Sequence, residues 1–192
     1  GDEYFQMVEE FMQAVFDRWP NVVVQFEDFE TPKALPILTA YRDKYRCFND
    51  DIQGTGAVFL GGYIGAVNLS GVPIEDQRLV FMGAGSAGVG VAKQLVEYYT
   101  KRGLSESEAR DKFWLVDTKG LVTEDRGDHL AEHKKYFSRT DNNGRQYRTL
   151  EEVIAYVKPS ALVGLAATFG VFTEPAVRAL KASVDQGGPN RR

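Results

Sequence analysis

The sequence has little cysteine, little histidine and no excess of basic residues. Cys47 is its one cysteine and it has two histidines, which excludes an internal disulfide framework and a zinc site built from cysteines. Its 23 basic and 27 acidic residues give a net charge of −4, which argues against binding to nucleic acid or an anionic membrane through charge. No apolar run approaches the roughly 20 residues that cross a bilayer. We therefore expect no nucleic-acid partner and no membrane partner.

The composition is that of a folded protein. Of the 192 residues, 43% are hydrophobic and 12% are aromatic, values that argue against disorder and fit one or two globular domains. The sequence begins with Gly1 instead of methionine and ends in a polar stretch, residues 186–192, which we predict to be a loop. No signal or transit peptide is visible. We expect a piece of a longer intracellular protein, located in the cytoplasm or the mitochondrial matrix.

Helix and strand patterns alternate along the sequence. Val22–Val24 predicts a short buried strand, and Thr31 as N-cap with Pro32 at the first helical position predicts a helix that reaches about Tyr45. Later strands are predicted over 78–82, 113–116 and 161–165. Helices are predicted over 4–18, 55–69, 86–102, 105–110, 149–157 and 173–184. The spacing of the apolar residues makes the first of them amphipathic. Ser105 with Glu108 and Thr149 with Glu152 fit capping boxes. The alternation indicates an α/β fold with a parallel sheet.

A G-x-G-x-x-G pattern follows one predicted strand and opens the next predicted helix; its residues are Gly83, Ala84, Gly85, Ser86, Ala87 and Gly88. The first glycine permits a tight turn, the second lets the backbone approach a pyrophosphate, and the third lets helix and strand pack closely. The helix N-terminus offers free N–H groups to the phosphates. The pattern favours a Rossmann-type, doubly wound, mostly parallel sheet that binds a dinucleotide. The alternative is a glycine-rich turn without a ligand.

The next predicted strand ends at Asp117, whose carboxylate could accept hydrogen bonds from ribose hydroxyls. It lies farther from the glycines than the roughly 20 residues of the usual fingerprint, and the extra helix over 105–110 accounts for the excess. Asp117 favours NAD, because a carboxylate repels the 2′-phosphate of NADP. Thr118 and Lys119 could instead bind that phosphate, so the choice between NAD and NADP stays open.

Two pairs of adjacent carboxylates stand where apolar segments give way to loops. They are Glu27-Asp28 and Asp50-Asp51. Ligands of open α/β sheets bind at the carboxyl ends of strands, and adjacent carboxylates repel each other unless a cation lies between them. Three or four convergent oxygens suit Mg²⁺ or Mn²⁺. Since acidic dipeptides are common, the alternative is a set of exposed acids at strand ends.

Four stretches resemble the malic enzyme family. They are Gln25-Phe-Glu-Asp-Phe29, Phe48-Asn-Asp-Asp-Ile-Gln-Gly-Thr55, Phe81-Met-Gly-Ala-Gly-Ser-Ala-Gly88, and Lys158-Pro159 ahead of the predicted strand that leads to Phe172-Thr173. The motif around Asp50-Asp51 is highly specific to that family, and the resemblance covers nearly the whole chain.

The resemblance implies a role for each motif. It implies that Glu27, Asp28 and Asp51 are the protein ligands of a divalent metal. Asp50 would be a catalytic carboxylate that supports a lysine in proton transfer. Residues 83–88 would face the cofactor phosphates, and residues 117–119 would meet the adenosine ribose.

The resemblance also implies a reaction, the oxidative decarboxylation of (S)-malate to pyruvate and CO₂ with reduction of NAD(P)⁺. A general base removes the C2 hydroxyl proton as hydride leaves, a divalent metal acts as Lewis acid as CO₂ is lost, and a general acid protonates the resulting enolate. The family's catalytic tyrosine and lysine lie upstream of its Gln-Phe-Glu-Asp motif, and a Leu-Ser-Asn-Pro segment lies downstream. We expect both outside this chain.

The expected organisation is therefore two partial domains. Residues 1–49 would form the C-terminal end of the N-terminal catalytic domain, itself α/β, and residues 50–192 an incomplete NAD(P)-binding domain. The partner would be a small-molecule substrate, and the full-length protein a homo-oligomer, dimer or tetramer. Two other hypotheses remain: a non-catalytic dinucleotide-binding module, or another Rossmann dehydrogenase such as an amino-acid dehydrogenase. The last leaves both carboxylate pairs unexplained.

Several basic residues near position 130 are weaker candidates. His129 and His133 are four residues apart and could hold zinc if helical, but their charged surroundings favour a solvated helix face. Lys134 and Lys135 could reach a 2′-phosphate, although surface charge is the favoured interpretation. Arg126 could contact a phosphate or a carboxylate.

Overall fold

The computed structural model describes residues 1–127 and 129–185, and it divides into two units. The first unit is Gly1–Thr55, and the second begins at Gly56. The domain boundary expected from the sequence, between residues 49 and 50, stays a prediction. The loop predicted over residues 186–192 lies outside the described residues.

The first unit contains two helices and a pair of short parallel strands. In chain order its elements are α1 (Asp2–Arg18), β1 (Val24–Phe26), α2 (Thr31–Tyr41), β2 (Cys47–Asn49) and the π-helical turn η1 (Asp50–Gly54). Val8 and Met12 on one face of α1 pack against Phe26, Ile37 and Tyr41. This is the amphipathic stripe that the apolar spacing predicts, and it holds the two strands against the helices.

Three predictions for the first unit were wrong in detail. The strand is Val24–Phe26 and not Val22–Val24, because the parallel pairing with β2 runs from Val24 opposite Cys47 to Phe26 opposite Asn49. α2 ends at Tyr41 instead of Tyr45, although one further turn follows, in which the Tyr45 N–H donates to the Tyr41 carbonyl at 2.9 Å. The N-cap of α2 is Glu30, one residue before Thr31.

The second unit begins within α3 (Thr55–Ser70), whose first residue closes the first unit. The remaining elements are the 3₁₀ turn η2 (Ile74–Asp76), β3 (Leu79–Met82), α4 (Ser86–Lys101), α5 (Glu106–Arg110), β4 (Phe113–Asp117), β5 (Gly120–Leu121), α6 (Glu132–Lys135), α7 (Leu150–Val157), β6 (Ala161–Gly164) and α8 (Glu174–Asp185). The capping boxes predicted to open α5 and α7 are both confirmed. None of the helices in the described part of the chain is long and apolar enough to cross a membrane.

The sheet of the second unit is mostly parallel, as predicted. Its strand order is β5-β4-β3-β6, in which β3 pairs in parallel with both β4 and β6 and only the short β5 is antiparallel. The chain therefore steps from β3 to β4 on one side and later returns to place β6 on the other side of β3. This reversal creates a switch point at the carboxyl ends of β3 and β6, where ligands of open α/β sheets bind.

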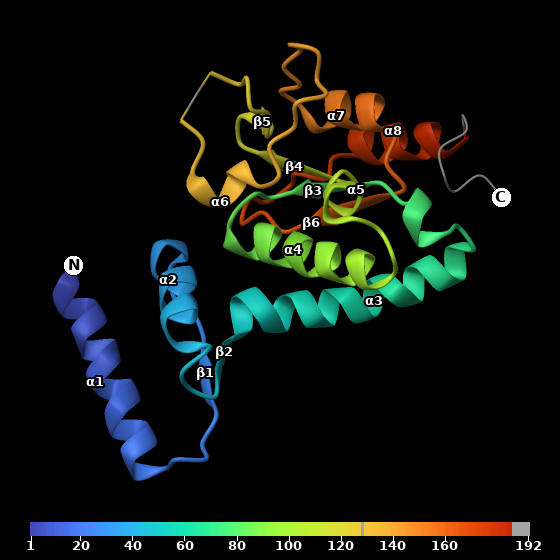
Figure 1. The fold of residues 1–192 in the computed structure, drawn as a ribbon. Coiled ribbons are helices and arrows are strands. Elements are labelled where there is room, and N and C mark those ends of the chain that lie inside the picture. The colour runs from blue at the N-terminus through green and yellow to red at the C-terminus, as the bar shows by residue number, and fades with distance from the viewer. Residues whose placement is uncertain (128, 186–192) are drawn as a thin grey trace. The chain divides into compact units, whose positions relative to one another are not determined.

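Helices cover both faces of this sheet, with α4 on one side and α7 and α8 on the other (Figure 1). Alternate residues of β3 enter opposite layers, since Phe81 packs in the cluster with α4 while Val80 packs in the cluster with α7. Both side chains are fully buried. Two covered faces explain why the predicted strands are continuous apolar runs instead of alternating ones.

Candidate metal centre and dinucleotide site

Parallel pairing of β1 and β2 brings the two acidic motifs to one edge of the small sheet. Phe26 lies opposite Asn49 in the ladder, so Glu27-Asp28 and Asp50-Asp51 both begin one residue after a paired position. The strands end at the same level, and their carboxyl ends present four carboxylates together. The two acidic motifs, which are more than 20 residues apart in the sequence, therefore lie side by side in the folded unit.

Three of these carboxylates converge on one point. One oxygen each from Glu27, Asp28 and Asp51 lie within 4.8 Å of one another. Asp28 has a left-handed backbone, with φ of 60°, a conformation that aspartate tolerates better than most residues. This turn directs the Asp28 N–H to Asp51 Oδ2 at 3.0 Å. The contact fixes the two motifs against each other.

Asn49 organises the turn that carries Asp50 and Asp51. It is 1% exposed, its side-chain oxygen accepts from the Ile52 N–H at 2.9 Å, and its own N–H donates to Gln53 Oε1 at 3.0 Å. Gly54 leaves room for the Asp50 carboxylate, because a Cβ at that position would collide with it. Sequence reasoning missed Asn49; its signal is an N-capping residue type at the last position of a strand.

The electrostatics of the cluster fit a divalent cation. Desolvation raises the pKa of the Glu27 carboxyl, and a hydrogen bond with Asp50 and the charge of Asp51 raise it further. Carboxylates this close repel one another, and a cation relieves the repulsion. Three hard oxygen donors with open solvent beside them suit Mg²⁺ or Mn²⁺, which keep water in their remaining positions.

The glycine loop has the geometry that each glycine was expected to supply. Gly83 has φ of +124°, and a Cβ there would lie 2.5 Å from the Leu165 backbone at the end of β6. A Cβ on Gly88 would collide with the Gly83 carbonyl, so this glycine permits the close packing of α4 on the loop. A Cβ on Gly85 would meet nothing within 4 Å. The backbone at Gly85 is therefore open to a ligand, and Ser86 and Ala87 begin α4 beside it.

Asp117, at the end of β4, forms ion pairs with Arg126 and Lys134. The sequence offered both residues only as weaker candidates. Arg126 donates to both carboxylate oxygens, at 2.9 and 3.1 Å, and Lys134 Nζ lies 2.7 Å from Oδ2. Burial would raise the pKa of Asp117, but the hydrogen bonds from Arg126 and Lys134 outweigh that effect and the pKa is lowered. The cluster therefore carries two positive charges and one negative charge at neutral pH.

The remaining candidates from the sequence are the turn residues after β4, Lys135 and the two histidines. Thr118 and Lys119 are exposed in the turn after β4, and the Lys119 N–H donates to Asp117 Oδ1 at 2.9 Å. Lys135 pairs with Glu132 on the surface. His129 precedes α6 and His133 lies within it, so the pair does not share one helical turn. This arrangement does not support zinc held by two histidines of one helix.

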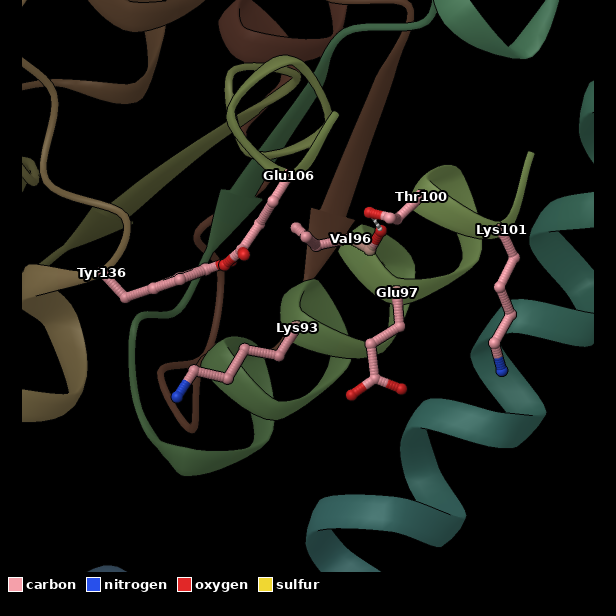
Figure 2. A pocket seen from close by; sticks show the side chains of 7 residues that line it. All are labelled: Lys93, Val96, Glu97, Thr100, Lys101, Glu106 and Tyr136. Carbon is pink, nitrogen blue, oxygen red and sulfur yellow. Dashed lines mark hydrogen bonds between the residues drawn. The ribbon is translucent and has the colours of Figure 1, made fainter. Parts of the chain in front are cut away.

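A separate hollow of about 530 Å³ lies along the second half of α4 (Figure 2). Its lining residues are Lys93, Val96, Glu97, Thr100, Lys101, Glu106 and Tyr136. None of them belongs to the glycine loop or to the Asp117 cluster. Within it, Tyr136 donates to Glu106 at 2.5 Å, a contact that ties the end of α6 to the start of α5.

The fold, the switch point and the glycine loop define an α/β protein of the Rossmann-like class. Comparison with family models refines this class. The model of the malic enzyme NAD-binding domain matches residues 52–188, and the model of the malic enzyme N-terminal domain matches residues 1–42. The chain belongs to the malic enzyme family.

Known relatives agree with this assignment. The chain is 46% identical over 184 residues to the NADP-dependent malic enzyme of Dictyostelium discoideum and 38% identical over 191 residues to the NAD-dependent malic enzyme of Acinetobacter baylyi. These matches cover 96% and 97% of the chain and 34% of each relative. The chain thus spans about a third of the length of these relatives.

Solved structures show the same fold at low sequence identity. A malic enzyme of Entamoeba histolytica matches with a TM-score of 0.69 at 22% identity, covering 90% of this chain and 34% of that one. An NAD-dependent malic enzyme of Thermotoga maritima matches with a TM-score of 0.69 at 23% identity, covering 90% and 43%.

Proposed function

We propose that the longer protein expected around this chain, called here the complete enzyme, oxidatively decarboxylates (S)-malate. The products are pyruvate, CO₂ and NAD(P)H. The observation that carries the proposal is the convergence of Glu27, Asp28 and Asp51 in a chain of the malic enzyme family. The names of relatives at 38–46% identity support it.

In this proposal Glu27, Asp28 and Asp51 hold Mg²⁺ or Mn²⁺. The bound cation supplies Lewis-acid charge to the substrate oxygens as negative charge develops. The left-handed turn at Asp28 and its hydrogen bond to Asp51 set the directions of two carboxylates in advance. Such pre-arrangement lowers the cost of assembling a site from groups that repel one another.

Asp50 is the proposed catalytic residue. It lies next to the Asp51 ligand and helps to raise the pKa of the Glu27 carboxyl, and the space at Gly54 keeps its carboxylate folded over the turn. We assign it the support of a lysine, expected elsewhere in the complete enzyme, that moves the proton of the substrate. The loop Gly83–Gly88 receives the cofactor pyrophosphate at the start of α4.

Turnover of malate tests the proposal directly. The complete enzyme, supplied with malate, Mn²⁺ and NAD⁺ or NADP⁺, should release CO₂ and pyruvate in equal amounts with NAD(P)H, and chelation of the metal should stop the reaction. The 192-residue chain assayed alone tests the second hypothesis, which predicts dinucleotide binding without turnover. Reduction of cofactor by an amino acid, with no need for metal, would instead favour the third hypothesis.

The Asp117 cluster supports use of NADP⁺. A carboxylate alone would repel a 2′-phosphate, but Arg126 and Lys134 reverse the charge at the end of β4. Their side chains are 8% and 21% exposed, so water screens them less than it screens an open surface charge. The named relatives include enzymes of both cofactor types, and the preference proposed here rests on the charge of the cluster.

Replacing Lys134 by Gln should therefore raise the KM for NADP⁺ about tenfold or more, since a hydrogen bond to a charged group is worth about 1.5–3 kcal/mol. The KM for NAD⁺ should change much less. Lys135→Gln is the matched control, because Lys135 is exposed and pairs with Glu132. Equal effects of Lys134→Gln on both cofactors would remove Lys134 from cofactor choice.

The proposal includes a homo-oligomer, dimer or tetramer, and an intracellular location in the cytoplasm or mitochondrial matrix, as the family resemblance implies. Sedimentation of the complete enzyme measures the first, and fractionation of cells measures the second.

A further inference from the structure

His133 makes a contact that neither its spacing from His129 nor the charge of its segment foretells. Its Nε2 lies 3.2 Å from the backbone oxygen of Ala84. Ala84 is the second residue of the glycine loop and is 3% exposed. A buried carbonyl needs a donor, because leaving it unpaired costs the desolvation of a polar group.

The partner atom settles which form of the imidazole is present. A carbonyl oxygen only accepts hydrogen bonds, so Nε2 of His133 must carry the proton. The ring is either the neutral Nε2–H tautomer or the imidazolium, and both donate to Ala84. The contact therefore acts as a donated hydrogen bond in either state.

This bond fixes the orientation of one peptide plane in the loop. The described part of the chain has no cis peptide, and in a trans peptide the C=O and the next N–H point in opposite directions. When the Ala84 C=O points to His133, the Gly85 N–H points away from it. The position of a Cβ on Gly85 meets nothing within 4 Å, so the backbone at Gly85 borders open space.

The residues that follow His133 anchor the segment that carries it. Lys134 pairs with Asp117 at 2.7 Å, Phe137 is 1% exposed in the core beside α4, and Tyr136 donates to Glu106 at 2.5 Å. Figure 2 shows the Tyr136 and Glu106 side chains pointing toward each other across the hollow beside α4. These contacts hold the four-residue α6, and with it the imidazole of His133, in place.

We propose that His133 is a positioning residue of the dinucleotide site, which holds the Ala84–Gly85 peptide so that the Gly85 N–H faces the approaching pyrophosphate. The proposal rests on the dinucleotide-binding role proposed above. His133 does not touch the cofactor; it acts through the backbone of Ala84. The N–H of Gly85 joins the free N–H groups at the start of α4 as a donor to the phosphates.

Variants of the complete enzyme test this role. His133→Phe keeps a ring of similar size but removes the donor, and it should raise the KM for the dinucleotide about five- to tenfold. The KM for malate and kcat should stay close to the original values. His133→Gln places an amide N–H near the position of Nε2 and should restore the cofactor KM to within about twofold of the original.

His129→Phe is the matched control, because His129 is the other histidine of the chain and is exposed; it should leave all three parameters unchanged. Thermal unfolding of each variant shows whether a change in KM follows loss of the fold. An unchanged cofactor KM in an active His133→Phe enzyme overturns the inference, and so does an equal rise in His133→Phe and His133→Gln. If the complete enzyme without substitutions turns over no malate, the proposed function is overturned instead.

Discussion

Asp51→Asn in the complete enzyme is expected to lower Mn²⁺-dependent turnover of malate by roughly a hundredfold or more. The change removes one of three converging carboxylates and with it a full negative charge at the cation site. The amide oxygen of asparagine can still accept from the Asp28 N–H, which Asp51 accepts at 3.0 Å, so the turn at Asp28 should persist and the loss should fall on the cation. Turnover as a function of Mn²⁺ concentration measures the effect, and direct titration of Mn²⁺ gives the metal affinity.

Asp43→Asn is the control for Asp51→Asn. Asp43 belongs to the same unit and is exposed, with one weak ion pair to Arg42 at 4.0 Å. The control variant should keep its metal affinity and its turnover, since an exposed ion pair contributes little. Near-normal activity of Asp51→Asn at low Mn²⁺ concentration would contradict the assignment of Asp51 as a ligand.

Gly85→Ala is expected to weaken dinucleotide binding without lowering the stability of the fold. The added methyl group meets no atom of the protein, and the backbone at Gly85 has φ of −81°, which alanine adopts without strain. Stability should hold or rise by about 0.4–1 kcal/mol. Dinucleotide affinity should fall tenfold or more, because the methyl group occupies the side from which the pyrophosphate approaches. Thermal unfolding and a fluorescence titration with NAD(P)H measure the two quantities.

Substitutions at two other glycines provide comparisons for Gly85→Ala. Gly65→Ala in α3 also places its methyl group in open space, and it should stabilise the helix without changing dinucleotide affinity. Gly88→Ala should reduce both stability and affinity, because its Cβ collides with the Gly83 carbonyl. If Gly85→Ala binds NAD(P)H as tightly as the unchanged protein, the loop does not approach the pyrophosphate at Gly85.

Local patterns in the sequence predicted those features that neighbouring residues control. The capping boxes that begin at Ser105 and Thr149 open helices where expected, because the bonds involved lie within one helical turn. Gly83 and Gly88 have the close backbone contacts that the glycine pattern indicates. The mistaken strand at Val22–Val24 shows the limit of this reasoning, since three valines are apolar enough for a strand but only the partner strand sets its register.

The carboxylate cluster was predicted in part from the sequence and depends in part on the tertiary structure. The sequence offered Glu27-Asp28 and Asp50-Asp51 as pairs at strand ends, and the family resemblance selected three of the four as metal ligands. The spatial convergence of Glu27, Asp28 and Asp51 depends on the parallel pairing of β1 with β2. The sequence did not indicate Asn49, because its role is to cap a turn, and that role is visible only in its hydrogen bonds with Ile52 and Gln53.

By itself the sequence determined the α/β class, the glycine loop, the helix caps and the residues with the chemistry for a metal site. These depend on residue type, on periodicity and on contacts a few positions apart. Only the tertiary structure decided the state of Asp117, which two cations nine and seventeen residues away hold in place, and the contact of His133 with Ala84 forty-nine residues away. Such pairings form because the sheet and helices bring distant segments together. A local sequence pattern does not indicate which residues of those segments will pair.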